Sequence, residues 1–138
     1  MENVWYLSGR MTGIPQFNYP RFTEVAKELR ERGYTIQTPS EGDRHDLTAT
    51  IMESPDGALD SLGGDTTWAD FLSEDVKTIA DHCTGIILMD DWWWSRGATL
   101  ECFLAMTLEY PLMKYWEGSL RPTSRRRCLE LIKVGMFR

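Results

Sequence analysis

The sequence predicts an α/β protein with a doubly wound, mostly parallel sheet of four to five strands flanked by helices. Short apolar runs alternate along the chain with amphipathic helical patterns, which is typical of parallel sheets with helices on their faces. Residues 85–89 form an uninterrupted apolar run that begins with a glycine and is followed by two aspartates. Such a run indicates a strand that is buried on both faces, as parallel strands are.

The first part of the chain has a β-α-β pattern. Residues 3–8 are rich in β-branched and aromatic side chains and predict the first, central strand. Glycines and a proline in residues 8–19 indicate a turn, although no dinucleotide or triphosphate loop motif is present there. We expect a helix over residues 19–32, capped by Asn18, and a second strand over residues 34–38. The inward face of that helix is expected to consist of Phe22, Val25, Ala26 and Leu29.

Residues 40–67 break this pattern and form an acidic excursion, with one possible helical turn over residues 48–53. Loops of this length are usually functional or disordered, and we expect a lid or a partner-facing loop. Its acidic residues are Glu41, Asp43, Asp46, Glu53, Asp56, Asp60 and Asp65.

The second part of the chain continues the alternation of helices and strands. We expect helices over residues 67–82 and 97–109, strands over residues 85–90 and 111–116, and a last helix over residues 122–134. Together with the first part, this order predicts a single domain, residues 1–138, with a flavodoxin-like or Rossmann-like three-layer sandwich. The helix before the central strand has an apolar stripe of Trp68, Phe71, Leu72, Val76 and Ile79, and the helix after it one of Leu100, Leu104, Ala105 and Leu108.

The composition limits the function classes. The chain has 138 residues and a net charge of −6, which disfavours binding to nucleic acid or to a membrane surface. Three cysteines without CxxC spacing indicate reduced, buried thiols, and two isolated histidines argue against a metal site. We therefore expect a cytoplasmic protein with no metal and no cofactor.

Two carboxylates occur on the apolar stripes of the two helices that flank the strand at residues 85–90. Asp75 lies three to four residues from Leu72, Phe71 and Ile79, and Glu101 lies beside the second stripe. A buried carboxylate is costly unless it is paired, hydrogen-bonded or protonated, so the two are a candidate acid and nucleophile. The alternative is that each lies at the edge of its stripe and reaches water.

Two groups of motifs resemble the nucleoside 2-deoxyribosyltransferase-like superfamily, in the compact form common in phage and prophage genomes. The resemblance covers residues 4–38 and 68–115. The first group is Tyr6-Leu7-Ser8-Gly9-x-Met11-Thr12-Gly13 followed by Phe17-Asn18-Tyr19-Pro20. The second is Asp75, the strand, and then Trp94-Ser95-Arg96-Gly97-Ala98-x-x-Glu101, whose S-x-G-x-x-x-E spacing is the most specific element.

The resemblance implies a role for each matching residue. Glu101 matches the nucleophile that attacks the anomeric carbon, and Asp75 matches the carboxyl group that helps the nucleobase depart. Tyr6 matches the phenol that positions the nucleophile. Ser95 stands where monophosphate hydrolases of the superfamily carry a phosphate-binding serine and nucleoside transferases carry an aspartate, which favours a 5′-monophosphate. Burial favours the neutral form of a carboxyl group, which suits Asp75 as the proton donor.

The substrate is expected to bind around the turn after each strand. Ser95, Arg96 and Gly97 at a helix N-terminus can hold a phosphate, and Ser8 and Gly9 can add to that site. A base can stack on Trp94 or on its neighbours Trp92 and Trp93, although a tryptophan run also occurs in cores and subunit contacts.

Two departures from the superfamily pattern and one of its general properties bear on the ligand and the assembly. Arg10 replaces a proline, and Asp90 and Asp91 replace a Pro-Gly pair. The additional acid at the rim keeps an unphosphorylated nucleoside in consideration. In relatives a neighbouring subunit completes the pocket, which implies a homo-oligomer.

These observations favour an enzyme that cleaves the N-glycosidic bond of a (deoxy)nucleoside or its 5′-monophosphate, by hydrolysis or base exchange. The first alternative is a non-catalytic module on the same fold that binds a nucleotide or a host partner. The second is an interaction protein whose acidic excursion and tryptophans contact a partner. The sequence leaves open the base and the sugar.

Overall fold

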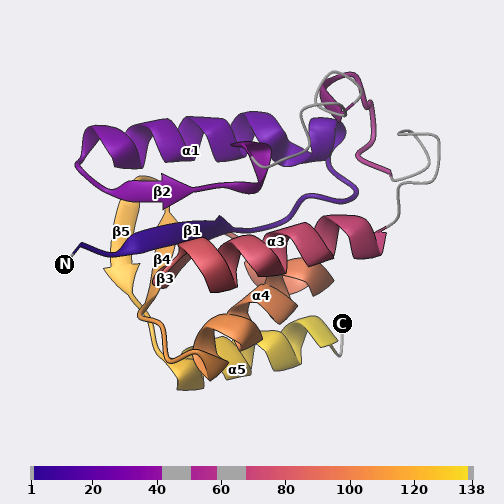
Figure 1. Cartoon of the computed structure of the whole chain (residues 1–138). Coiled ribbons are helices and arrows are strands. Elements are labelled where there is room, and N and C mark those ends of the chain that lie inside the picture. Colours follow the sequence, from indigo (N-terminus) through magenta and orange to yellow (C-terminus); the bar gives the residue numbers. More distant parts are fainter. Residues whose placement is uncertain (1, 42–50, 59–67, 137–138) are drawn as a thin grey trace.

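The computed structural model describes residues 2–41, 51–58 and 68–136, and its architecture is a three-layer α/β sandwich (Figure 1). The five strands form one sheet in the order β2-β1-β3-β4-β5. The strands are β1 (Val4–Ser8), β2 (Thr35–Gln37), β3 (Gly85–Leu88), β4 (Leu112–Trp116) and β5 (Ser119–Pro122). The longer helices are α1 (Tyr19–Glu31), α3 (Trp68–His82), α4 (Arg96–Thr107) and α5 (Arg125–Met136).

The first four strands in this order are parallel, which confirms the predicted doubly wound class. The central strand β1 pairs with β2 on one side and with β3 on the other. The chain therefore leaves β1 toward one edge of the sheet and returns to build the other edge from β3 onward. Ligands of open α/β sheets bind at such a reversal, outside the carboxyl ends of the strands. Here this point follows Ser8 and Leu88.

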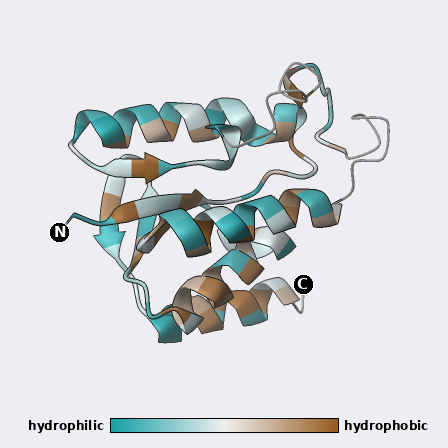
Figure 2. Ribbon diagram, in the orientation of Figure 1, coloured by the Kyte–Doolittle hydropathy of each residue, from teal (hydrophilic) through white to brown (hydrophobic). Residues whose placement is uncertain are grey.

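Alternating side chains on the strands supply two cores. Trp5, Leu7 and Ile87 point to the face that α1 covers, and α1 contributes the predicted side chains Phe22, Val25, Ala26 and Leu29 to that core. The opposite face packs against α3, α4 and α5 (Figure 1). Figure 2 shows hydrophobic and hydrophilic residues alternating along α1 and α3, as expected for helices with one buried face.

The inward face of α4 differs from the predicted one. Leu100 and Leu108, which we expected to point inward, are 42% and 41% exposed. The face that packs against the sheet consists instead of Ala98, Glu101, Cys102 and Ala105. Because these side chains are small apart from Glu101, the helix axis can approach the sheet closely, and Glu101 is brought into the interior.

The C-terminal part contains a strand that the sequence analysis missed. No strand was predicted between the one expected over residues 111–116 and the helix expected over residues 122–134, but β5 begins at Ser119 and pairs antiparallel with β4. Glu117 and Gly118 form the two-residue hairpin loop, with φ of 46° and 81°. Positive φ at both loop positions is typical of the tight hairpins that match the twist of antiparallel strands.

Part of the acidic excursion packs against the turn after β1. Residue Gly13 donates a backbone hydrogen bond to Gly57 (2.9 Å), and Gln16 donates one to Ser54 (2.8 Å). Ile51 is fully buried in a cluster with Phe17, Tyr19 and Phe71. Residues 42–50 and 59–67, on which most of the predicted lid falls, lie outside the described residues.

The three cysteines are buried free thiols, as predicted. Burial raises the pKa of the Cys83 thiol to about 12. A hydrogen bond with Cys128, together with burial, raises the pKa of Cys102. Within the described ranges, no helix is long and apolar enough to cross a membrane.

We expect all three thiols of the native protein to resist alkylation by iodoacetamide at about pH 8, because all three are buried and the reagent cannot reach them. For Cys83, burial also disfavours the thiolate, which is the reactive form. Peptide mass spectrometry after alkylation with and without urea measures this. Modification should be confined to the sample in urea. Rapid labelling of Cys83 in the native sample would contradict the burial seen here.

Candidate functional site

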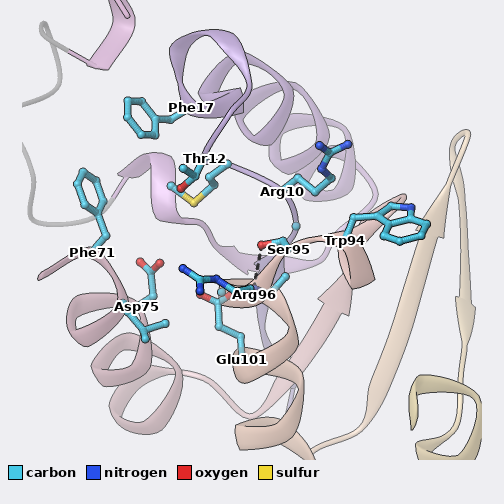
Figure 3. Close-up of a pocket in the computed structure, with 14 residues that line it drawn as sticks. Arg10, Thr12, Phe17, Phe71, Asp75, Trp94, Ser95, Arg96 and Glu101 are labelled. Carbon is cyan, nitrogen blue, oxygen red and sulfur yellow. Dashed lines mark hydrogen bonds between the residues drawn. The ribbon is translucent and has the colours of Figure 1, made fainter. Parts of the chain in front are cut away.

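A cavity of about 480 Å³ opens beyond the carboxyl ends of β1 and β3 (Figure 3). Its volume lies within the range of about 300–1,000 Å³ that is usual for small-molecule sites. Three segments line it: the loop after β1, the first half of α3, and the turn from Trp94 into α4. The lining residues are Gly9, Arg10, Met11, Thr12, Phe17, Phe71, Leu72, Asp75, Trp94, Ser95, Arg96, Gly97, Ala98 and Glu101.

Glu101 lies at the inner wall of this cavity, and only 5% of it is exposed. The hydroxyl of Ser8, at the end of β1, donates a hydrogen bond of 2.6 Å to its Oε1 atom. Ser8 itself is completely buried. A short hydrogen bond of this kind to a carboxylate is stronger than one between neutral groups, and it fixes the direction in which the carboxylate points. Glu101 is therefore held by the central strand while it faces the cavity.

Asp75 reaches the same cavity from α3, and it is 7% exposed. Phe71 and Ile79, four residues before and after it on the helix, are also buried, so Asp75 lies on the inner stripe as the sequence predicted. The alternative, that both acids lie at stripe edges and reach bulk water, is wrong for both residues. Figure 3 shows the two carboxyl groups arriving from neighbouring helices.

The N-terminus of α4 forms one rim of the cavity. Ser95 caps the helix, and its hydroxyl accepts a hydrogen bond of 3.1 Å from the backbone N–H of Ala98. The side chain of Arg96 extends toward Asp75 and Glu101 in Figure 3. Arg10 lies on the rim after β1. The lining thus carries two guanidinium groups and two carboxyl groups, so this part of an acidic protein has a balanced charge.

Two phenylalanines that sequence reasoning did not assign to the site form a further wall. The rings of Phe17 and Phe71 are stacked, with centroids 5.9 Å apart and planes 11° from parallel. Phe17 reaches this position because Gln16, Phe17 and Asn18 all have left-handed backbone conformations, with φ between 53° and 62°. Such conformations are costly for residues other than glycine and often occur at functional sites.

This left-handed turn also explains why Asn18 does not act as predicted. Asn18 precedes α1, but its side chain makes no capping bond and donates instead to the carbonyl of Arg10 at 2.9 Å. That bond ties the two ends of the loop after β1 together. The motif Phe17-Asn18-Tyr19-Pro20 was used in the sequence analysis only as part of the resemblance, and the ring of Phe17 was not recognised as part of the cavity.

The three consecutive tryptophans are divided between the cavity and the core. Trp94 lines the cavity. Trp92 is buried in the core between the sheet and α4–α5, and Trp93 packs against the same core. Trp92 is therefore a core residue, which was the alternative to base stacking. Of the three tryptophans, only Trp94 lies where a base in this cavity could contact it.

Tyr6 does not line the cavity. It is buried on the face of β1 that carries Ser8 and packs in a cluster with Ile79 and Cys83. Gly9, by contrast, lines the cavity, and a Cβ atom there would lie 3.1 Å from the Cβ of Met89. The lack of a side chain at Gly9 thus lets the loop after β1 pack tightly on the end of β3.

The acid expected at the rim faces elsewhere. Neither Asp90 nor Asp91 lines the cavity, and a carboxylate oxygen of Asp90 lies 3.8 Å from a guanidinium nitrogen of Arg21. Asp90 and Asp91 are therefore not placed to repel a phosphate in the cavity, as the sequence had suggested. Within the part of the chain that the structure describes, no group of three or more His, Cys, Asp or Glu side chains could hold a metal ion.

We expect Ser8→Ala to lower the free energy of unfolding by about 1.5–3 kcal/mol, since it removes a hydrogen bond to a buried carboxylate. In a Glu101→Gln background the same change should cost about 1 kcal/mol, because the acceptor is then neutral. Urea denaturation of the four proteins of this double-mutant cycle measures the coupling. An equal cost of Ser8→Ala in both backgrounds would show that the charge of Glu101 does not strengthen its hydrogen bond with Ser8.

Residues 3–114 match the protein family described as a domain of unknown function, DUF4406. Neither a curated protein nor a solved structure matches the chain. The matched span contains the strands β1 to β3, the start of β4 as far as Lys114, and every residue that lines the cavity. Since it covers well over half of the sequence, the chain belongs to the DUF4406 family.

Proposed function

We propose that this protein cleaves the N-glycosidic bond of a (deoxy)nucleoside 5′-monophosphate or nucleoside, through a glycosyl-enzyme on Glu101. One observation carries the proposal: two buried carboxyl groups from neighbouring helices line a single cavity of ligand size. Buried carboxyl groups are costly, and a pair with different surroundings is the usual equipment of enzymes that cleave glycosidic bonds. The resemblance of the surrounding motifs to nucleoside 2-deoxyribosyltransferase-like proteins supports the same reaction.

In the first step, a carboxylate oxygen of Glu101 attacks the anomeric carbon and the bond from this carbon to the base nitrogen breaks. The electron pair of that bond goes to the base, and Asp75 donates a proton to it. The transition state has oxocarbenium character, so an ionised carboxylate next to the sugar stabilises it. The hydrogen bond from Ser8 holds Glu101 in position for this attack.

In the second step, the ester on Glu101 is released. For hydrolysis, Asp75 removes a proton from a water molecule whose oxygen attacks the anomeric carbon, and the carboxylate of Glu101 is restored. For base exchange, a nitrogen of a second base attacks the anomeric carbon instead. Its proton passes to Asp75, and the bond to Glu101 breaks and restores the carboxylate. The access of water to the ester decides between these outcomes.

The remaining lining residues are suited to bind the other two parts of the substrate, which are the 5′-phosphate and the base. The amides and hydroxyl at the N-terminus of α4, with Arg96 and Arg10, suit a 5′-phosphate. The stacked pair of Phe17 and Phe71 offers a flat apolar surface for a base, and Trp94 offers another. A partner subunit that completes the pocket, as in the superfamily, is part of the proposal.

The deciding experiment is incubation of the protein with a panel of ribo- and 2′-deoxyribonucleosides and their 5′-monophosphates, with free base followed by chromatography. Glu101→Ala should reduce base release by about 10³-fold or more, because the covalent nucleophile is lost. Glu101→Gln, which keeps the volume of the side chain, should do the same. The matched control is Glu109→Gln, at an exposed glutamate beyond the end of α4.

An unchanged rate in Glu101→Gln would overturn the mechanism. If a nucleotide raises the melting temperature of the wild-type protein but is recovered intact from every reaction, the protein is the non-catalytic binding module instead.

We expect Arg96→Gln to raise KM for a 5′-monophosphate by about 10-fold or more and to leave KM for the matching nucleoside nearly unchanged. The reason is that a charge-assisted hydrogen bond to phosphate contributes about 1.5–3 kcal/mol. Steady-state kinetics on both substrates measures the difference, with Arg125→Gln on the exposed start of α5 as the control. An equal increase for both substrates would show that Arg96 acts on the carboxyl groups and not on a phosphate.

A further inference from the structure

A second hollow of about 290 Å³ lies outside the site described above, between the end of β3, the β4–β5 hairpin and the start of α5. It shares no lining residue with the first cavity. Its walls include the cations Lys114, Arg121 and Arg127 and the aromatic residues Trp93 and Trp116. The family match ends at residue 114, so α5 and most of the hairpin that build this hollow lie beyond the matched span.

Two of the cations are direct neighbours across the hairpin. Lys114 on β4 and Arg121 on β5 are register partners in the antiparallel pair. Side chains at such positions point to the same face of the sheet, and like charges placed directly opposite each other are destabilising. Replacing either Lys114 or Arg121 by a neutral residue would remove this repulsion.

The hollow also has an excess of positive charge. Arg127 joins the first two cations from α5, and its guanidinium group pairs with Glu130 at 3.2 Å. Asp90 is the one carboxylate in the lining, and on its other side it faces Arg21. Since Glu130 offsets Arg127, the hollow keeps Lys114 and Arg121 against the one acid Asp90, which is a local excess of positive charge in a chain with a net charge of −6.

Aromatic surface adjoins these cations. Trp116 lies two residues after Lys114 on the same strand and therefore on the same face, and it is 52% exposed. Trp93 lies across from the hairpin, with its ring held edge-on against Trp92 at a centroid distance of 6.2 Å. Exposed indole rings beside cations are the combination on which an aromatic ring with an anionic group can stack and be neutralised.

We propose that this hollow is a binding site for a small aromatic phosphate. The phosphate contacts Lys114, Arg121 and Arg127, and the aromatic ring lies against Trp116 and Trp93. The negative charge of the phosphate offsets the repulsion between Lys114 and Arg121, and this gain in stability contributes to the affinity. A volume of about 290 Å³ is near the lower limit for ligand pockets, so the occupant is a ligand with one ring system and one phosphate. This site is independent of the reaction proposed for Glu101.

Isothermal titration calorimetry with phenyl phosphate tests the proposal. Lys114→Gln and Arg121→Gln should each weaken binding by about 10-fold or more, the loss of one charge-assisted contact. Lys133→Gln, exposed on α5 and absent from the lining of the hollow, is the matched control and should bind like the wild type. Inorganic phosphate should bind more weakly than phenyl phosphate, and phenol and benzoate more weakly still.

Thermal denaturation adds a second readout, because it also measures the stability of the variant without ligand. Without ligand, Lys114→Gln should keep or raise the melting temperature, because it removes the repulsion from Arg121. With phenyl phosphate, the wild-type protein should gain stability and the variant should not.

Several results would overturn the proposal. One is the absence of any heat of binding with phenyl phosphate, and another is binding that is lost in Arg96→Gln but kept in Lys114→Gln and Arg121→Gln. Inorganic phosphate or benzoate binding as tightly as phenyl phosphate would exclude an aromatic phosphate as the preferred ligand class.

Discussion

The hydrogen bond between Ser8 and Glu101 is the contact on which the site depends. It joins residues 93 positions apart, one at the end of the central strand and the other in the middle of α4. Both are buried, so without this bond the carboxylate would carry most of its desolvation cost with less compensation. The bond also sets the geometry, because it fixes α4 against β1 with a carboxylate between them. Asp75 then completes the wall from the neighbouring helix.

The loop after β1 is the second element that the cavity requires, and it is held from several directions. Three successive left-handed residues would be an unstable turn in isolation. Backbone hydrogen bonds from residues 13 and 16 to the segment 51–58 and the bond from Asn18 to Arg10 hold it in place. The segment 51–58, although it comes from the acidic excursion, is thus part of the structure that shapes the site. The result is a rigid position for Phe17 opposite Phe71.

The short helix η4 (Trp92–Trp94) stands between the two hollows of the molecule. Trp94 faces the cavity with the carboxyl groups, Trp93 faces the basic hollow, and Trp92 is the buried anchor between them. The reversal of the chain after β3 therefore supplies both sites with aromatic surface. Asp91, with φ of 57°, precedes this helix. A 3₁₀ helix has three residues per turn, so three consecutive side chains point in three different directions.

The sequence by itself determined the fold class and the order of most elements, and it made Asp75 and Glu101 candidates for burial while leaving open that both reach water. Periodicity was sufficient for Asp75, because a carboxylate between apolar residues at helical spacing is buried whenever the stripe is. It failed for α4, where Leu100 and Leu108 were assigned to the interior and proved exposed. The small residues of that helix face the sheet instead, and which arc of a helix is covered depends on its neighbours.

Only the tertiary structure decided the rest of the site. The four-residue strand β5 is too short and too polar for its pattern to indicate a strand, and its pairing with β4 gives it its conformation. The stacking of Phe17 on Phe71, the separation of the three tryptophans and the opposition of Lys114 to Arg121 all join residues from different elements. Such contacts depend on the backbone path between elements, which local propensity and periodicity do not encode.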